Sequence, residues 1–596
     1  MEALLSPGVQ VNEIDFSDYV TAAASCIVGM VGGARRGPTT PTLITNQEEF
    51  LRIFGTPSEK EYGAYSALEA LTQVSQLFYQ RVIHTPTIAK AGETGVDKLL
   101  FTAIAAGTKY NDITIDIQYT SDNNFNIVVT PPDGKEVENY SELSLDTESE
   151  KFVRSVINGK SKYLNVIFSS EGTLTTKQLK LTGGTDGATY GKAGGPDSAF
   201  SIKTKYFDST LNYCLVKFTQ PDPFGYFDMY IYNEDRSQII EQLKDLTLDP
   251  TNERYVDLVV ASGSDHIEVT YNADALGDRE DISDTEYVIM NGSDSIALND
   301  KYDIIEGLQL FANPEVIDIN LLAAPGWYDA DVVNKGVSIC RNRGDSFYIA
   351  STPPKLNAQQ ANNWANGGGE FAVDHDAFDD SYGGIYWPWL SVSDPYTRKN
   401  IWLPPEGLVL AQYAYNDRVG QPWFAPAGLN RGIMSRPLAV EYSATKGERD
   451  AIYGNRNIVN PIINYKGSGI VIWGQKTMQR KATALDRINV RRLMNYVKKI
   501  ISASTSYFVF EPNDQYSWKK WVDMVEPKLE NIKSLRGIYE YKVKMKPTAS
   551  EIENNTMPGT IWIKPTKAAE FIPLNFIIMP YSASFKDEDL EKSSIT

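Results

Sequence analysis

The chain has 596 residues, of which 42% are hydrophobic and 22% charged, so its length and composition predict three or four globular domains. Its formal net charge of −19 argues against a nucleic-acid-binding protein, because phosphate contacts require a positive surface. The cysteines, Cys26, Cys214 and Cys340, are far apart and fit no disulfide framework, which favours a reducing compartment. We see no signal-peptide pattern and no apolar run that could span a bilayer, so we expect a soluble protein made in a cytoplasm.

Both ends of the chain alternate apolar and polar residues, as β-strands do. The apolar positions at the front are Val9, Val11 and Ile14, and those at the back include Phe576 and Ile578. We expect residues 1–20 and 581–596 to form extended arms. Strands without a partner in their own chain can pair with neighbouring copies, which is typical of a polymer more than of an enzyme.

Residues 21–90 are predicted to begin an α/β core. The small apolar residues of Ala22–Val31 indicate a buried strand, and Asn46 is placed to cap a helix, with Glu49 three residues on. Apolar residues at helical spacing predict another helix within residues 61–78.

Residues 91–310 show the alternation of apolar and polar residues that is typical of strands. They are predicted to form one or two antiparallel β-rich domains inserted into that core. The predicted strands are Ile113–Ile117, Asn126–Val129, Leu215–Phe218, Met229–Tyr232 and Tyr255–Val260.

The α/β pattern returns over residues 311–455. A strand at Val316–Ala323, a helix at Asp329–Arg343 and a strand at Ser346–Ala350 predict a βαβ unit, and therefore a parallel pair of strands. The remaining predicted elements of this segment are helices at Asn357–Ala365 and Glu406–Asp417 and a strand at Ile385–Val392.

Residues 456–580 are predicted to form a mixed C-terminal domain. Its predicted strands are Gly469–Trp473, Ile538–Val543, Thr560–Ile563 and Phe571–Ile578, and its predicted helices are Asp486–Ile501 and Trp518–Val525. The predicted fold class is therefore a multidomain protein of the α/β and α+β types, with inserted antiparallel β-rich domains and extended terminal arms.

No residues form a recognisable catalytic, cofactor or metal site. His84, His266 and His375 are isolated, and the sequence contains neither a G-x-S-x-G nor a G-x-x-x-x-G-K-[ST] motif. The glycine-rich run 183–187 fits a linker better than an anion cradle. The acidic run around Asp376 lacks the spacing of a calcium loop, because Phe378 occupies the third ligand position.

One basic cluster stands out in this acidic chain. Between positions 476 and 499 the only acidic residue is Asp486, and the basic residues are Lys476, Arg480, Lys481, Arg487, Arg491, Arg492, Lys498 and Lys499. The helix predicted from Asp486 can bury an apolar stripe and present Arg487, Arg491 and Lys498 on another face. Such a face either docks an acidic partner or is merely solvated.

Several motifs, in the same order, resemble those of contractile-phage tail sheath proteins. They are Leu5–Val9, the run 183–187, Trp423–Gly432, Gly474–Thr477 with Arg487–Leu493, and Phe510–Asp514. The resemblance covers residues 1 to about 80 and 310 to 580, and it leaves out the β-rich middle, which fits an outward-facing insertion.

This resemblance implies a structural subunit, with no enzymatic activity and no cofactor. Sheath subunits form a homo-oligomer, a helical stack of rings expected to be hexameric, and their terminal arms add strands to neighbouring subunits. The sheath contracts to drive a tail tube through the host envelope. The implied partners are the tube protein and the baseplate and tail terminator proteins, with no nucleic acid and no direct membrane insertion. The implied location is the virion tail, after assembly in the host bacterial cytoplasm.

The resemblance also implies that the domain 456–580 contacts the tube. The residues implied to face the tube are Arg487, Arg491, Arg492, Lys498 and Lys499. The sequence leaves open which of them point outward and which brace the core. Flexible joints for contraction are expected at Asp15–Tyr19 and Pro580–Asp587.

Three alternatives stay open. The first is the sheath of a non-phage contractile injection system. The second is an α/β hydrolase-like enzyme, although the strand end at Ala323–Gly326 offers no nucleophile or acid. The third is a carbohydrate-binding tail spike or fibre that stacks sugars on Tyr386, Trp387, Trp389 and Trp402, but these aromatic residues fall in strand patterns that favour a core.

Overall fold

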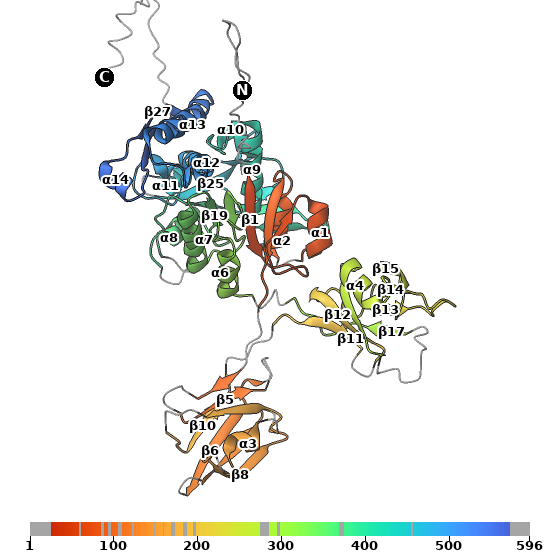
Figure 1. Ribbon diagram of the computed structural model, residues 1–596. Coiled ribbons are helices and arrows are strands. Elements are labelled where there is room, and N and C mark those ends of the chain that lie inside the picture. The colour runs from red at the N-terminus through yellow and green to blue at the C-terminus, as the bar shows by residue number, and fades with distance from the viewer. Residues whose placement is uncertain are drawn as a thin grey trace, which may run out of the picture.

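The computed structural model describes residues 26–572 except 59–60, 85–88, 93–96, 105–109, 122–123, 133, 148, 159, 169–172, 183–186, 195–197, 274–284, 295–298, 369–374 and 455–456. The predicted arm positions Val9, Val11, Ile14, Phe576 and Ile578 lie outside the described residues, as do both predicted joints. Figure 1 shows a large body and two smaller domains that branch from it. No helix in the described part of the chain is long and apolar enough to cross a membrane.

The large body is built on a nine-stranded sheet with the order β2-β3-β1-β18-β19-β20-β25-β26-β23. The strands from β3 to β25 run parallel, and antiparallel strands close both ends of the sheet. Their bounds are β1 (Ile27–Gly32), β2 (Thr42–Ile44), β3 (Gln76–Arg81), β18 (Leu321–Ala323), β19 (Phe347–Ser351), β20 (Gly383–Trp387), β23 (Ile433–Met434), β25 (Val459–Tyr465) and β26 (Gly469–Ile472).

Helices cover both faces of this sheet, because its parallel strands are buried on both sides. Within β1, Val28 and Met30 point into one apolar core and Ile27 and Val31 into the other. The first core receives α1 (Gln47–Phe54), α2 (Tyr62–Ala70) and α9 (Glu406–Val419). The second receives α6 (Lys301–Gln309), α7 (Ala330–Arg343), α8 (Ala358–Ala365) and α11 (Lys446–Ile452). The predicted α/β core and its βαβ unit, β18-α7-β19, are confirmed.

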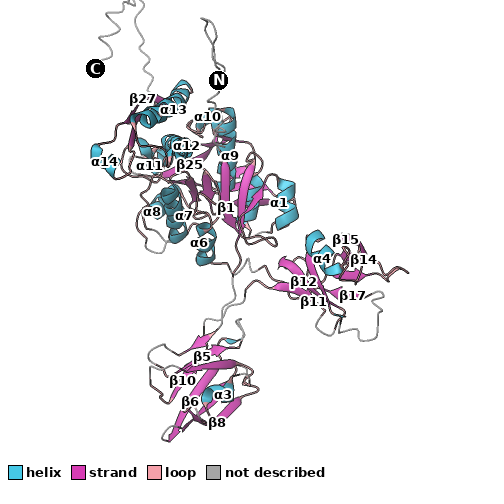
Figure 2. Cartoon of the chain, in the orientation of Figure 1, coloured by secondary structure: helices cyan, strands magenta, loops and turns pink. Residues whose placement is uncertain are grey.

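Two β-rich domains follow β3 (Figure 2). Each has an apolar core of its own. The first contains β4 (Lys90–Ala91), β5 (Leu99–Ala103), β6 (Thr114–Ser121), β7 (Asn124–Thr130), β8 (Glu138–Ser144), α3 (Val153–Ile157), β9 (Leu164–Phe168) and β10 (Lys177–Lys180). The second contains β11 (Tyr190–Ala193), β12 (Phe200–Phe207), β13 (Leu215–Phe218), β14 (Phe227–Tyr232), β15 (Ile239–Leu246), α4 (Val256–Gly263), β16 (Ile267–Tyr271) and β17 (Glu286–Val288). Helix α6 falls within the segment predicted as inserted, but it packs on the main sheet.

The chain then returns to the large body and ends in a helical layer with a hairpin. A small sheet of β21 (Leu390–Ser393), β22 (Asn400–Leu403) and β24 (Ala439–Val440) and the short helix α10 (Gly428–Arg431) precede it. The C-terminal elements are α12 (Ile488–Thr505), α13 (Gln515–Ser534), β27 (Ile538–Met545), α14 (Ala549–Glu553) and β28 (Gly559–Pro565).

Several predicted elements are wrong in type or length. Of the strand predicted at Val316–Ala323 only Leu321–Ala323 is a strand, and the helix predicted at Trp518–Val525 is longer and spans Gln515–Ser534. The helix predicted within residues 61–78 ends at Ala70, because the apolar residues that follow form the buried strand β3. The strand predicted at Tyr255–Val260 is the helix α4, whose Val256 and Val260 are buried one turn apart despite the strand preference of β-branched residues. The strand predicted at Ile385–Val392 is two strands, β20 and β21, which lie in different sheets on either side of Pro388.

Strand β1 and helix α2 meet at two glycines, which makes the contact intolerant of a side chain. A Cβ atom added at Gly32 would lie 2.7 Å from the Cα atom of Gly63 and 2.9 Å from the hydroxyl of Tyr79. We predict that Gly32→Ala lowers the free energy of unfolding by about 1–3 kcal/mol, the usual cost of overpacking a core. Gly447→Ala on α11 is the control, since nothing lies within 4 Å of its added Cβ. Equal melting temperatures of the two variants in scanning calorimetry would contradict the prediction.

Candidate functional site

Helix α12 carries the predicted basic residues and joins the C-terminal domain to the α/β core. Its first residue, Ile488, packs into the core beneath the main sheet. Leu493 and Val497 instead join the apolar core of the C-terminal domain, with Trp521 of α13. The helix is therefore in contact with the protein on more than one side, which limits the face that it can offer to solvent.

Arg492 forms a buried ion pair with Asp417 of α9. Two hydrogen bonds of 2.8 and 2.5 Å join the guanidinium to the carboxylate, and the side chains are only 5% and 2% exposed. Burial alone lowers the pKa of Arg492, but the Asp417 carboxylate more than offsets this effect and raises it above its ordinary value. The guanidinium also lies 4.9 Å from the centre of the Tyr413 ring. Arg492 therefore braces α12 against α9.

Arg491 and Lys498 meet at Tyr382, next to strand β20. The Arg491 guanidinium donates to the Ser381 hydroxyl and lies 4.0 Å from the centre of the Tyr382 ring. Lys498 donates to the Tyr382 hydroxyl over 3.0 Å. Arg491 is 5% exposed, and burial lowers its pKa.

The other two basic residues also have partners within the chain. Arg487 precedes α12 and makes a two-pronged ion pair with Glu570, at 2.7 and 3.0 Å. Lys499 pairs with Asp318, in the loop before β18. Arg487, Arg491 and Lys498 therefore do not form one outward basic face, because Arg491 is buried and Arg487 pairs with Glu570, which leaves only Lys498 exposed. Contact of any of the five residues with a tube stays a prediction, and burial makes Arg491 and Arg492 unavailable in this conformation.

The hairpin of β27 and β28 is the second feature of the C-terminal domain. The strands pair antiparallel from Ile538 opposite Pro565 to Met545 opposite Gly559. One face, with Tyr541, Val543 and Ile563, packs on the apolar stripe of α13. Two predicted strands, at 538–543 and 560–563, are thereby confirmed.

The outer edges of this hairpin are open among the described residues, because β27 and β28 form a sheet of two strands. Its outward face carries Lys542 opposite Trp562, and Glu540 opposite Lys564. The packing on α13 stabilises the pair of strands, while each open edge presents a row of unpaired backbone donors and acceptors. This hairpin is therefore a candidate site for the addition of further strands.

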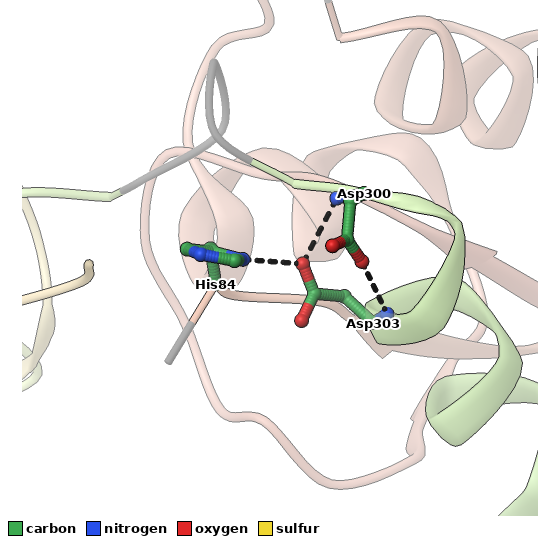
Figure 3. A group of neighbouring side chains, drawn as sticks. All are labelled: His84, Asp300 and Asp303. Atoms are coloured by element: carbon green, nitrogen blue, oxygen red, sulfur yellow. Dashed lines mark hydrogen bonds and ion pairs between the residues drawn. The ribbon is translucent and has the colours of Figure 1, made fainter. Parts of the chain in front are cut away.

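The three histidines build no clear metal site. His84 lies near Asp300 and Asp303, as Figure 3 shows, and its Nδ1 is 2.8 Å from the Asp303 carboxylate. Both carboxylates are already used at the start of α6: Asp300 accepts from two backbone N–H groups, and Asp303 accepts from the Asp300 N–H. The two aspartates therefore cap helix α6, and Asp303 also pairs with His84. Their oxygens are already engaged and do not form an open set of metal ligands.

The crevice where an α/β enzyme would bind its substrate lies outside β1 and β18, the point where the chain reverses its winding direction. It has a volume of about 360 Å³ and is lined by Gly33, Tyr62, Gly326, Trp327 and the buried Glu61, among others. Both Glu61 oxygens accept hydrogen bonds from Ser58. Among the described lining residues there is no serine, cysteine or histidine, so the crevice lacks the Ser-His or Cys-His pair of a hydrolase that uses a hydroxyl or thiol nucleophile.

The aromatic residues considered for sugar stacking divide into two groups. Tyr386, Trp387 and Trp389 are buried in the core, and the Trp387 and Trp389 indoles donate to backbone carbonyls. Only Trp402 of this set is exposed. They do not form a sugar-binding platform.

Open strand edges in the C-terminal domain are a feature of proteins that assemble with further copies. The comparisons with known proteins agree. Residues 480–578 match the family described as the phage tail sheath C-terminal domain. The tail sheath protein of Vibrio phage KVP40 is 33% identical over 323 residues, which cover 50% of this chain and 48% of that protein. The tail sheath protein of Enterobacteria phage T4 is 30% identical over 302 residues, which cover 48% and 46%.

The chain thus spans about half the length of the curated relatives that it matches. Among solved structures, the sheath tail protein of Desulfitobacterium hafniense is similar over 90% of this chain and 93% of its own, with 13% identity and a TM-score of 0.44. The contracted sheath complex of an extracellular contractile injection system covers 47% of this chain and 80% of its own, with 22% identity and a TM-score of 0.38. The resemblance to phage tail sheath proteins that the motifs predicted is confirmed.

The Arg492–Asp417 pair yields a test of how α12 is held. We predict that Arg492→Ala lowers the free energy of unfolding by about 3–5 kcal/mol, because it leaves the Asp417 carboxylate buried without a partner. Lys533→Ala, which removes an exposed pair with Glu530, should cost only about 0–1 kcal/mol. The measurement is thermal unfolding by scanning calorimetry at neutral pH. A loss for Arg492→Ala no larger than that for Lys533→Ala would show that the pair does not brace the helix.

A buried carboxyl at the start of α9 yields a pH test. Burial raises the pKa of Glu406 to about 7, against the opposing hydrogen bond from Ser351. The folded protein therefore binds this proton more tightly than the unfolded chain. The protonated Glu406 side chain stabilises the fold at low pH, and this stabilisation is lost as the pH rises through about 7. Glu406→Gln cannot ionise, and we predict that it gains up to about 3 kcal/mol over the wild type at pH 8, with far less gain at pH 5.

Thermal melts of both proteins at the two pH values measure this difference. The exposed Glu315→Gln is the matched control, for which we expect the same small effect at both pH values. A Glu406→Gln effect that is independent of pH would mean that this carboxyl does not titrate in the folded protein.

Proposed function

We propose that this chain is the structural subunit of a contractile tail sheath. It would polymerise as stacked rings around a tail tube and contract to drive that tube through a host envelope. The observation that carries the proposal is the hairpin of β27 and β28, a pair of strands with two open edges on a domain that matches the sheath C-terminal family.

Strand addition supplies the joints of such a polymer. The arm positions Val9, Val11 and Ile14, and Phe576 and Ile578, would extend the hairpins of neighbouring copies at their open edges. Backbone hydrogen bonds hold a strand firmly, while its register fixes which side chains face the apolar layer of α13. The rings could then rotate and shift during contraction while the copies stay linked.

The remaining roles follow from this assembly. The partners would be further copies of the chain in hexameric rings, the tube protein, and the baseplate and terminator proteins. The subunit would assemble in the host cytoplasm and reside in the virion tail, with energy stored in the extended assembly rather than in a hydrolysed nucleotide. The sheath of a non-phage injection system would use the same joints, so the hairpin does not discriminate between the two.

The arm model predicts that tube assembly depends on the apolar face of the N-terminal arm strand. Side chains alternate between faces, so Val9→Asp with Val11→Asp places charges on the apolar face, whereas Gln10→Asp with Asn12→Asp places the same charges on the polar face. We expect the first pair to abolish tubes and the second to preserve them. Negative-stain electron microscopy of the purified proteins, across a range of concentration and salt, measures the outcome.

Deletion of residues 573–596 is the companion experiment, because it removes Phe576 and Ile578 and none of the described contacts. The truncated protein should stay a folded monomer by scattering and calorimetry, and form no tubes. Tubes from either the truncated chain or the Val9→Asp, Val11→Asp variant would refute the arm model. A wild-type chain that never polymerises, even with tube protein added, would refute the sheath function itself.

A further inference from the structure

The loop between α12 and α13 projects an apolar knob that no described part of the chain covers. Phe510 is fully exposed, and Tyr507 and Val509 beside it are more than half exposed. The φ angle of Phe510 is +72°, in the left-handed region that bulky residues rarely adopt. A strained backbone that holds a phenyl ring in water persists only where the surroundings enforce it.

Hydrogen bonds on both sides of Phe510 hold this loop in place. Asn513 donates to the backbone carbonyl of Thr556 and accepts from the indole N–H of Trp518. Asp514 caps α13 by accepting from the Ser517 N–H. The N–H of Glu511 bonds to the carbonyl of Phe508, so the turn around Phe510 is closed on both sides. The knob is therefore a fixed projection on the body of the protein.

A groove lies between α9 and α10 of the large body, near the C-terminal end of α13. It has a volume of about 450 Å³, its apolar lining residues are Leu408, Ala411, Leu429, Ile433 and Met434, and polar residues such as Thr72, Gln73 and Gln412 line the rest. Leu429 and Ile433 are exposed. The groove includes part of the motif Trp423–Gly432, and the knob is the motif Phe510–Asp514, neither of which the arm model uses.

Charge distinguishes the two surfaces. The groove is rimmed by Arg418, Arg431 and Arg436, and of these only Arg436 has a carboxylate partner among the described residues, which is Glu69. Glu511 is exposed next to Phe510 and forms no ion pair within the described chain. An aromatic anchor flanked by an acid matches an apolar floor flanked by arginines.

The two surfaces of one chain cannot meet. The knob stands at the start of α13, and the end of α13 contacts Trp423, whose indole donates to the Leu535 carbonyl. The groove begins near this end, where Arg431 stacks on Phe424. The 20 residues of α13 separate the ends by about 30 Å at 1.5 Å per residue. A contact between knob and groove must therefore join two copies.

We propose that Phe510 of one copy inserts into the α9–α10 groove of the next copy, with Glu511 beside Arg418 and Arg431. Two different patches of one chain would then meet head to tail, which is the type of contact that builds rings and helical stacks. The proposal rests on the proposed function and adds to it a side-chain contact that is separate from strand addition by the arms.

Cysteine cross-linking tests the contact directly. Phe510→Cys chains are mixed with Leu429→Cys chains, assembled and oxidised, and the products are separated on a non-reducing gel. We expect a mixed dimer that depends on both substitutions. Phe510→Cys mixed with Leu258→Cys is the control, because Leu258, on α4 of an inserted domain, is 60% exposed against 42% for Leu429 and is therefore at least as accessible to oxidation. A cross-link to the control but not to Leu429→Cys, or to the tube protein only, would overturn the proposal.

Charge reversal gives a second readout that does not depend on oxidation. Arg418→Glu suits this test because Arg418 is exposed and donates to the Gln73 side chain, which carries no charge. We expect Glu511→Arg and Arg418→Glu each to raise the concentration needed for assembly by roughly threefold, and the double variant to recover most of the loss. Phe510→Ala should raise it on the order of tenfold.

The outcomes separate the two proposals. If the wild-type chain forms tubes and Phe510→Ala forms them at the same concentration, the knob contact is wrong and the sheath function stands. If the wild-type chain forms no tubes under any condition, the sheath function is wrong as well. Loss of tubes in Phe510→Ala with an unchanged melting temperature, together with recovery in the double charge variant, would support the contact.

Discussion

The seating of α12 on the α/β core is the constraint on which the rest of this structure depends. The helix carries the C-terminal domain, and its position is set by a buried ion pair between Arg492 and Asp417 and by the stacking of Arg491 on Tyr382. Removing two charges from water is costly unless their geometry is good and their remaining hydrogen bonds are made. Such a pair allows few alternative positions, so the domain that holds the hairpin is rigidly attached to the sheet.

The rigid attachment of the C-terminal domain contrasts with the hairpin of β27 and β28, whose edges have no partner strands in the described chain. Its edges are unsatisfied in the described chain, and in an isolated protein they would be a liability for aggregation. In a polymer the same edges become directional joints. A sheath needs rigid bodies linked by joints that survive movement. The ion pair of α12 would supply the first requirement and the hairpin the second.

The α/β core looks like an enzyme scaffold but carries no enzyme site among its described residues. Its crevice lies at the usual point of a doubly wound sheet, and the buried Glu61 has a pKa raised by burial to about 7. Perturbed carboxyls of this type are candidates for catalysis only where a reactive partner is within reach. Here Ser58 occupies both oxygens of Glu61, so the carboxyl belongs to the packing of α2.

The sequence by itself determined the α/β core, the inserted β-rich domains and the sheath resemblance, because these depend on local periodicity and on motifs that are contiguous in the chain. Helix α7, strand β19 and the strands of the hairpin could be predicted to within about two residues, whereas β18 starts at Leu321 and not at the predicted Val316. Strand β3 was missed, because a strand buried on both faces loses the period of two that marks an exposed one.

Only the tertiary structure decided which basic residues of α12 face solvent and which face a partner inside the protein. The partners of Arg492, Lys499 and Arg487 are Asp417, Asp318 and Glu570, which lie from 75 to 181 residues away along the chain. Periodicity along one helix carries no information about such distant carboxylates, and whether a charge faces solvent or a buried partner depends on them.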